Sequence, residues 1–180
     1  MNKKFKLLII ELIKTMFITA LIVIGISMIA QPTIVKGQSM YPTLEEGDYI
    51  MVNRLAYTDN NVKRGDIVIF KTELIDDKYN MKKNLVKRVI ALPNEHLIIK
   101  DGEVYIDGVK LQEKYLKDIY TKGNIVKVIP SNSVFVMGDN RGKSNDSRNC
   151  LIGDIDLEDL IGKAYIRIYP FNKIGKLNWM

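Results

Sequence analysis

The stretch Leu97-Ile98-Ile99-Lys100-Asp101-Gly102-Glu103-Val104-Tyr105-Ile106-Asp107-Gly108-Val109-Lys110-Leu111 decides the fold. It holds two Asp-Gly pairs, each flanked by short runs rich in β-branched and aromatic residues. An Asp-Gly pair in that setting is the strongest short-range signal for a tight β-hairpin turn. Two such turns in succession predict a meander of antiparallel strands, so the domain belongs to the β class.

Segments on both sides of the meander also predict strands, because they are short and rich in β-branched or aromatic residues. These segments are residues 48–53, 66–71, 85–92, 134–137 and 164–169. The polar segments 73–84 and 113–124 predict surface loops, and helix signals here are confined to about residues 157–161. We therefore expect a mainly β fold, with one compact antiparallel domain.

The N-terminal part of the chain has a different composition. Residues 15–35 carry no formal charge and are rich in Ile, Leu, Met, Ala and Val. At about 1.5 Å per residue, a helix of this length reaches roughly 30 Å, the hydrocarbon thickness of a bilayer. Pro32 disfavours helix at the residue before it. The sequence thus predicts a transmembrane anchor over residues 15–32.

Three lysines, Lys3, Lys4 and Lys6, precede the apolar run. The positive-inside rule then makes residues 1–14 a cytoplasmic segment and residues 33–180 an extracytoplasmic, β-rich domain. The alternative is a cleaved signal peptide. The apolar stretch is long for that role, and residues 28–30 lack a small-x-small cleavage pattern.

Composition restricts the classes of function. The net charge of +6 in 180 residues fits a domain resting on anionic lipid headgroups, and equally a solvated basic surface. The anchor and the lack of a recognisable binding motif argue against nucleic acid as a partner. One cysteine, Cys150, and one histidine, His96, cannot form an intramolecular disulfide or an ordinary zinc site. We expect no metal and no cofactor.

The segment Gly37-Gln38-Ser39-Met40-Tyr41-Pro42-Thr43-Leu44 begins just after the anchor. It places a candidate serine nucleophile, Ser39, beside the bilayer, but a serine hydroxyl needs a base to take its proton. His96 starts the hairpin region, where histidine is usually an ordinary turn or surface residue. A Ser-His-Asp arrangement is therefore disfavoured, and a Cys150–His96 pair more so.

A lysine base is the remaining option, and Lys87 is the best candidate. In a strand over residues 85–92, Leu85, Lys87 and Val89 share a largely apolar face. Burial there would lower the lysine pKa, and a shift from about 10.4 to about 8 costs roughly 3 kcal/mol. The alternative is an edge strand whose lysine reaches solvent. The alternation of residues alone favours neither the buried lysine nor the exposed one.

A third segment follows the strand at residues 134–137. It reads Gly138-Asp139-Asn140-Arg141-Gly142-Lys143-Ser144-Asn145-Asp146-Ser147-Arg148. Loops with Gly, Asn and Asp are usually plain turns. The two acidic and two arginine residues in this one also allow a rigid, ion-paired loop that could support an active site.

Together these segments resemble the type I signal peptidase family, membrane-anchored Ser-Lys proteases that remove signal peptides. The resemblance spans nearly the whole chain. Residues 39–44 resemble the nucleophile box, 64–70 a structural strand, 87–93 the general-base box and 138–148 the last box, while 161–164 and 169–171 resemble the C-terminal strand. It implies an N-terminal transmembrane helix followed by a compact antiparallel β catalytic domain of the signal peptidase type, in its Gram-positive form.

The resemblance also implies a role for individual residues. Ser39 would attack the scissile carbonyl, Lys87 would be the general base, and Ser144 would orient the Lys87 amine. Two ion pairs, Asp146 with Arg148 and Asp139 with Arg88, would hold the loop. The Ser39 backbone N–H would bind the oxyanion. Gly37 stands where some family members have a second donor, a serine hydroxyl, and Ala91 and Asn94 stand where glycine is common.

By the same resemblance, the substrate would lie extended between the segment before Ser39 and the strand that carries Lys87. The expected walls of its shallow pockets are apolar: Val35, Met40, Leu44, Leu85 and Val86. Such pockets accept small residues at positions −1 and −3. The expected partners are the signal peptides of preproteins, the lipid bilayer of the cell membrane and, nearby, the protein-export machinery.

Three alternatives stay open. Self-cleaving repressor-type peptidases share the Ser-Lys dyad, but they are soluble and carry a DNA-binding module. A non-catalytic membrane-anchored assembly factor with the same β domain would be expected to lack Ser39 or Lys87, and both are present. A signal peptidase dedicated to a narrow set of preproteins would have the same motifs.

Overall fold

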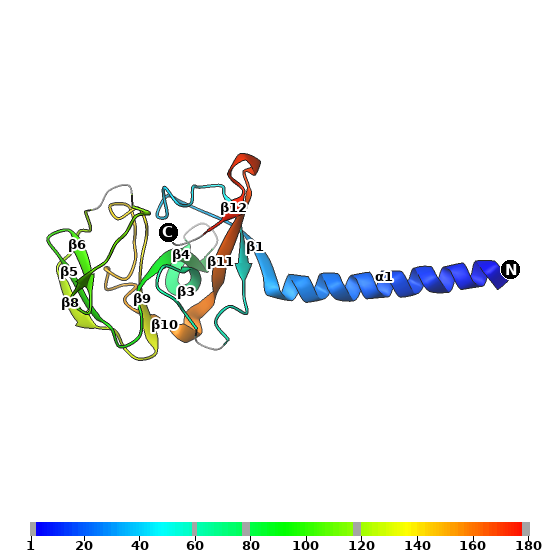
Figure 1. The fold of residues 1–180 in the computed structure, drawn as a ribbon, viewed down its shortest axis with the longest axis horizontal. Coiled ribbons are helices and arrows are strands. Elements are labelled where there is room, and N and C mark those ends of the chain that lie inside the picture. The colour runs from blue at the N-terminus through cyan, green and yellow to red at the C-terminus, as the bar shows by residue number, and fades with distance from the viewer. Residues whose placement is uncertain (1–2, 59–60, 77–79, 117–119, 178–180) are drawn as a thin grey trace.

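A single long helix leads into a β domain built from two antiparallel sheets (Figure 1). The structure, a computed structural model, describes residues 3–58, 61–76, 80–116 and 120–177. Figure 1 shows the helix running away from the domain on one side, with the smaller sheet on the far side. The fold is mainly β, as the sequence predicts.

The helix α1 (Lys3–Ile29) is long and apolar enough to cross a membrane. Over Lys4–Ser27 its mean hydropathy is 2.5, and none of this segment is buried against the domain. The hydroxyls of Thr15, Thr19 and Ser27 donate to carbonyl groups three or four residues earlier in the helix, at 2.8–2.9 Å. These three hydroxyls are thereby satisfied within the helix, as an apolar surrounding requires.

The helix ends before the predicted end of the anchor. Residues 30–32, predicted to be helical, belong to strand β1 (Ala30–Ile34). This strand pairs with β2 (Tyr49–Asn53), in a register that places Pro32 opposite Met51. Because β1 is an edge strand, Pro32 can occupy it without breaking the sheet. At its other end the helix continues back to Lys3, through the segment predicted to be cytoplasmic.

The larger sheet has eight strands and carries the chemistry-bearing residues. Its order is β1, β2, β11 (Leu160–Tyr169), β3 (Ile67–Asp76), β4 (Met81–Ala91), β9 (Ser133–Met137) and β10 (Ile155–Asp156), with β12 (Gly175–Lys176) paired to β11. The strand β4 lies in its interior, with β3 on one side and β9 on the other.

The smaller sheet contains the predicted meander. Its order is β7 (Val109–Lys110), β6 (Glu103–Ile106), β5 (His96–Lys100) and β8 (Ile125–Val128). Both Asp-Gly pairs form the turns, with φ of 53° and 84° at Asp101 and Gly102 and 51° and 79° at Asp107 and Gly108. Positive φ at both central residues is the type I′ geometry expected of such hairpins.

Strands β4 and β9 join the two sheets through the core. Ile90, Ala91, Phe135 and Met137 pack with buried residues of the smaller sheet such as Leu97. Other residues of the same strands, including Val89 and Val136, pack instead against Val68 and Phe70 of the larger sheet. The polypeptide around Lys87 is therefore enclosed by packed side chains.

Two predictions of local structure are wrong. Residues 73–76 and 81–84 form no free loop: they belong to β3 and β4, which stay paired as far as Asp76 opposite Met81. The predicted helix at residues 157–161 is a single 3-10 turn, Leu157–Asp159, and β11 begins at Leu160. Residues 73–76 and 81–84 carried no strand signal in the sequence. Neither face of the strands is buried here, so apolar and polar residues do not alternate along them.

One close backbone approach gives a test of the fold. A Cβ atom at Gly162 of β11 would overlap the carbonyl oxygen of Asn53 on β2, whereas one at Gly175 of β12 would meet nothing within 4 Å. We expect Gly162→Ala to lower the free energy of unfolding by about 1–3 kcal/mol through overpacking. Gly175→Ala, the control on the same hairpin, should change it by less than about 0.5 kcal/mol. Thermal unfolding in detergent micelles measures both, and equal midpoints would contradict the packing described.

Candidate active site

The candidate nucleophile lies in a tight turn between β1 and β2. The two ends of this connection are tied together, because Val35 N–H donates to Asp48 O at 2.8 Å and Gly47 N–H donates to Val35 O at 3.0 Å. Gly37 has φ of 78°, a conformation that glycine adopts without strain. Ser39 itself is half-buried. Its hydroxyl is thus held in place and still reachable from solvent.

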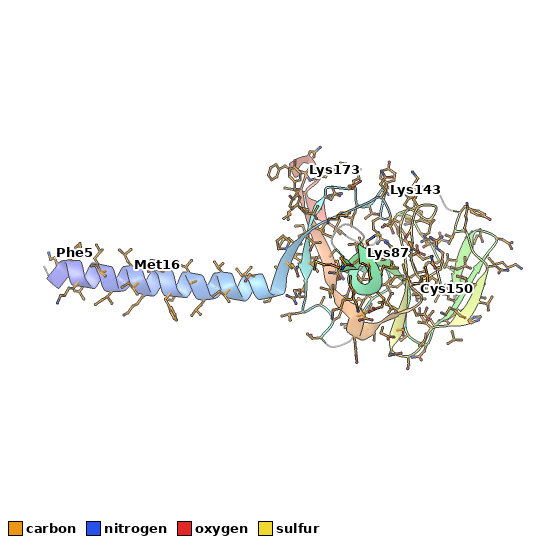
Figure 2. The ribbon with its side chains drawn as sticks, turned by 180° about the vertical axis from the view of Figure 1, so that it is seen from behind. Phe5, Met16, Lys87, Lys143, Cys150 and Lys173 are labelled. Carbon is orange, nitrogen blue, oxygen red and sulfur yellow. The ribbon has the colours of Figure 1, made fainter. Side chains whose placement is uncertain are left out.

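The structure brings Lys87 to this serine across 48 residues of sequence. Lys87 Nζ lies 2.8 Å from Ser39 Oγ and 3.0 Å from the carbonyl oxygen of Val86. The lysine is only 2% exposed, and Figure 2 shows it inside the β domain. The alternative of an edge-strand lysine that reaches solvent is wrong, because Lys87 is buried although its strand is paired on one side only up to this residue.

Burial changes the proton affinity of this amine. Removing an ammonium group from water disfavours its charged form. Burial accordingly lowers the pKa of Lys87 from 10.5 to about 8, although the carboxylates of Asp146 and Asp139 act in the opposite direction. A substantial fraction of Lys87 is therefore neutral near physiological pH and able to accept a proton.

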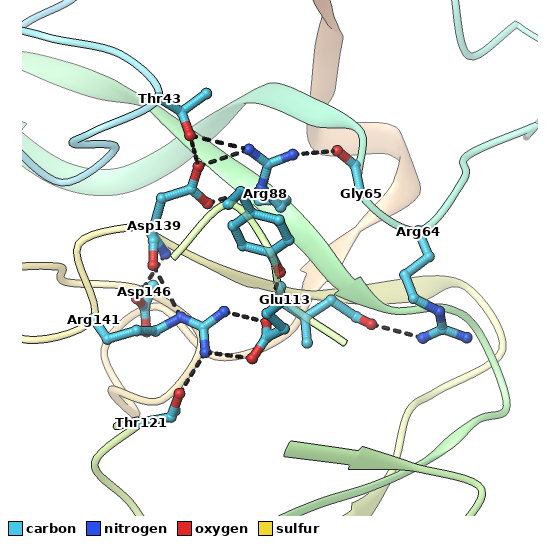
Figure 3. Close-up of polar contacts among 12 residues, drawn as sticks. Thr43, Arg64, Gly65, Arg88, Glu113, Thr121, Asp139, Arg141 and Asp146 are labelled. Carbon is cyan, nitrogen blue, oxygen red and sulfur yellow. Dashed lines mark hydrogen bonds and ion pairs between the residues drawn. The ribbon is translucent and has the colours of Figure 1, made fainter. Parts of the chain in front are cut away.

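The loop after β9 contains the two ion pairs that the resemblance implies. Arg88 and Asp139, both fully buried, meet in a two-point contact with N···O distances of 2.6 and 2.8 Å (Figure 3). Arg88 also donates to Gly65 O at 2.9 Å, and the Thr43 hydroxyl donates to Asp139. This pair thereby ties the loop to β4 and to the turn that follows Ser39.

The second pair, Asp146 with Arg148, lies within the loop at 2.8 and 2.9 Å. Asp146 also accepts a hydrogen bond from Gly138 N–H at 3.0 Å. Burial opposes ionisation of this carboxyl, but Arg148 outweighs burial and holds the pKa of Asp146 below its usual range. Asp146 is therefore a buried anion at neutral pH.

Ser144 does not make the expected contact with Lys87. Its hydroxyl oxygen is buried and has no well-formed hydrogen bond to any described residue, although it lies near enough to Asp146 to help lower the pKa of that carboxyl. The hydroxyl packs directly over Gly138, where a Cβ atom would overlap both Ser144 Oγ and Ser39 O. Gly138 therefore has to be glycine for Ser144 and the nucleophile turn to approach each other.

Several residues of the site had no role assigned from the sequence. Asn140 holds the nucleophile turn, with N–H donating to Ser39 O at 2.9 Å and Nδ2 donating to Gln38 O at 3.0 Å. Arg141 is buried against Glu113 and Thr121, which come from the weakly patterned segment 113–124 (Figure 3). The ring of Tyr115 lies 4.0 Å from the Arg88 guanidinium. Only a search for partners of each buried charge could have indicated them.

A groove of about 560 Å³ opens beside the dyad. It runs between β1 and the first half of β4, and both Ser39 and Lys87 line it. Of the predicted walls, Val35, Met40, Leu85 and Val86 line it. Leu44 does not: it is fully buried in the core below the turn, where its N–H bonds to Met40 O at 2.9 Å.

The two alternative arrangements, with His96 as the base for Ser39 or paired with Cys150, are not formed. His96 begins β5 in the smaller sheet, and Cys150 lies exposed in the loop that precedes β10. Among the described residues, no group of three His, Cys, Asp or Glu side chains is placed to hold a metal ion.

Comparison with known proteins gives a consistent family. Residues 9–169 match the family "Signal peptidase, peptidase S26". Signal peptidase I of Bacillus licheniformis is 36% identical over 97% of this chain and 95% of its own length. Signal peptidase I T of Bacillus subtilis (strain 168) is 38% identical, over 80% of this chain and 76% of its own.

Two further relatives extend the comparison. Probable signal peptidase I-1 of Synechocystis is 37% identical over 83% of this chain and 76% of its own. A crystal structure of a signal peptidase I from Enterococcus faecalis V583 is 28% identical, with a TM-score of 0.48, and the match covers 58% of this chain and 97% of that one. The chain therefore belongs to the signal peptidase family, peptidase S26, as a signal peptidase I enzyme.

Proposed function

We propose that this protein is a membrane-anchored serine endopeptidase that cleaves signal peptides from exported preproteins, with Ser39 as nucleophile and Lys87 as general base. The observation that carries the proposal is the 2.8 Å contact between Ser39 Oγ and the amine of a lysine that is 2% exposed. A general base has to lie within hydrogen-bond reach of the proton it removes and needs a pKa near the working pH. Lys87 meets both requirements.

The chemistry follows from this geometry. The neutral Lys87 amine accepts the Ser39 hydroxyl proton as Oγ attacks the scissile carbonyl, which forms a tetrahedral intermediate. The resulting ammonium then gives this proton to the leaving nitrogen, the C–N bond breaks, and an ester to Ser39 remains. Water attacks the ester with Lys87 again as base, which releases the signal peptide carboxylate and regenerates the serine.

The oxyanion of each intermediate needs a donor beside Ser39. The Ser39 backbone N–H is the proposed donor, and it donates no hydrogen bond to any residue that the structure describes. Gly37, two residues earlier, has no side chain with which to donate. Removing a single oxyanion donor typically costs 10²–10³ in rate, so one backbone amide makes a substantial contribution.

The groove supports the binding of an extended peptide. Strand β1 pairs only with β2, and residues 81–87 of β4 pair only with β3, among the described residues. Unpaired strand edges on the groove offer main-chain donors and acceptors to a peptide that adds as a strand. The walls formed by Val35, Met40, Leu85 and Val86 leave room for small residues at positions −1 and −3.

The anchor and the domain surface support a place at the cell membrane, with the N-terminus cytoplasmic and residues 33–180 outside. The lysines at positions 3, 4 and 6 favour this orientation. An exposed row of apolar side chains crosses β1, β2 and β11, where Ile34 pairs with Tyr49 and Tyr49 with Tyr169. Phe171 extends the row at 78% exposure. Tyrosines and large apolar side chains suit a lipid interface, and tethering raises the local concentration of substrate.

The direct test is incubation of the detergent-solubilised protein with a preprotein, followed by sequencing of the new N-terminus. We expect Ser39→Ala and Lys87→Ala each to reduce processing by about 10³-fold or more. Lys100→Ala, at an exposed position of the smaller sheet, should process normally. Normal processing by the Lys87→Ala protein would exclude Lys87 as the base.

The pKa of Lys87 predicts a pH dependence. Below about 8 the amine is mostly protonated and cannot act as base, so kcat/KM should rise about tenfold per pH unit there and level off above pH 8. Steady-state cleavage of a peptide substrate in micelles between pH 6 and 10 measures this. A profile that stays flat over this range would contradict a depressed lysine pKa.

The same shift predicts a cost in stability. Because the pKa falls from 10.5 in the unfolded chain to about 8 in the folded one, the unfolded chain binds an extra proton between these values. The penalty therefore grows as the pH falls from 10.5 to about 8, and below that it stays at about 3 kcal/mol. We expect Lys87→Met to abolish activity while raising the free energy of unfolding at pH 7, with the gain vanishing near pH 10.5.

The control for this effect is Lys100→Met, since Lys100 is exposed and its replacement should leave stability unchanged at either pH. Denaturant unfolding in micelles at pH 7 and pH 10.5 makes the comparison. Equal stability of wild-type and Lys87→Met protein at pH 7 would show that burial of the amine is not unfavourable.

A further inference from the structure

A second hollow, of about 740 Å³, lies on the opposite side of the nucleophile turn from the groove. Gly37, Ser39 and Met40 line the groove, whereas Gln38 and Tyr41 line this second hollow. Residues 37–41 therefore form a narrow ridge between the two. Asn140, which donates to Ser39 O and Gln38 O, lies in the wall of the second hollow. The hollow thus begins within one residue of the nucleophile.

Two of the charged side chains in the walls of this hollow form no ion pair with the described residues. Asp139 is paired with Arg88, Arg141 with Glu113, and Glu45 with Lys173. The remaining charged side chains, Glu46 and Lys143, are exposed and form no ion pair or side-chain hydrogen bond with any described residue. Figure 2 shows Lys143 and Lys173 along one edge of the domain, with Lys87 below them. An unpaired carboxylate and an unpaired ammonium are thus available to a ligand.

We propose that this hollow binds the first residues of the mature polypeptide, on the far side of the scissile bond, and that Glu46 and Lys143 make it sensitive to their charge. The inference rests on the proposed function. A peptide that fills the groove up to Ser39 has to cross the ridge at residues 37–41 to continue. At about 3.3 Å per residue, three mature residues extend about 10 Å beyond the scissile bond. They enter the hollow directly.

Charge reversal tests the two residues. We compare precursors that differ only by Glu or Lys at the second mature position, and measure kcat/KM. Lys143→Glu should shift the preference toward the Lys precursor by roughly two- to fivefold, the size expected of partly exposed charges. Glu46→Lys should shift it toward the Glu precursor. Lys100→Glu, at an exposed site in the smaller sheet, should leave it unchanged. Equal shifts in all variants, or none, overturn the charge sensitivity.

Photo-crosslinking tests the location. In a Ser39→Ala background, p-benzoylphenylalanine replaces Lys143 in the hollow, Lys82 in the groove or, as control, Lys100. The precursor carries one tag in its signal peptide and a different tag within its first ten mature residues. Each adduct is then denatured and digested between the two tags, so that the fragment left on the enzyme keeps only one of them. We expect Lys143 to capture the mature tag, Lys82 the signal-peptide tag and Lys100 neither.

The other outcomes separate the two proposals. Capture of the signal-peptide tag at Lys82, with no mature-tag adduct at Lys143 or an equal one at Lys100, overturns the inference and leaves the proposed function standing. Capture of the precursor at none of the positions overturns the proposed function, and with it the inference.

Discussion

The proposed chemistry depends on keeping the amine of one lysine, Lys87, out of water. Burial of Lys87 disfavours its ammonium form, but two buried carboxylates nearby, Asp139 and Asp146, favour it. Each of these carboxylates is matched by its own guanidinium, that of Arg88 or Arg148. A carboxylate paired with a guanidinium exerts a weaker field than a lone one, so these pairs favour the neutral form of Lys87 over its ammonium form.

Ser39, the proposed nucleophile, lies in a turn that is held by contacts from two distant parts of the chain. In the loop after β9, Asn140 donates a hydrogen bond to Ser39 O, and Gly138 packs closely against the same carbonyl. From β11, Arg167 donates to Thr43 O at 3.2 Å and pairs with Asp48 at 2.6 Å. A serine on a loop is usually mobile, but these contacts fix its backbone before any substrate arrives. Such preorganisation is where positioned groups obtain much of their effect on rate.

Those parts of the fold that follow from local rules were predictable from the sequence. The Asp-Gly hairpins need positive φ, and the buried strands need β-branched residues, so both leave a local pattern. The exposed parts of β3 and β4, residues 73–76 and 81–84, have neither. The residues of β1 also fit the end of an apolar helix, so this strand was not predicted. The Ser39–Lys87 pair was reached by eliminating other bases and by family resemblance. The partners of Arg141, Glu113 and Thr121, could not be predicted in this way. An ion pair between distant segments leaves no pattern in the sequence of either segment.

The position of the proposed base, Lys87, also favours a substrate that adds as a strand. A lysine with a low pKa has to lie on an interior part of the sheet, whereas a peptide can join a sheet only at an edge. Strand β4 satisfies both conditions, because it is paired on both sides after Lys87 and on one side only before it. Lys87 lies at this change, next to the open edge but enclosed by the core. Ser39 is still half-exposed in the free protein, so a peptide filling the groove removes the last water from the dyad. We therefore expect bound substrate to disfavour the Lys87 ammonium further, so that a larger fraction of the lysine is neutral and free to accept the serine proton when there is a bond to cleave.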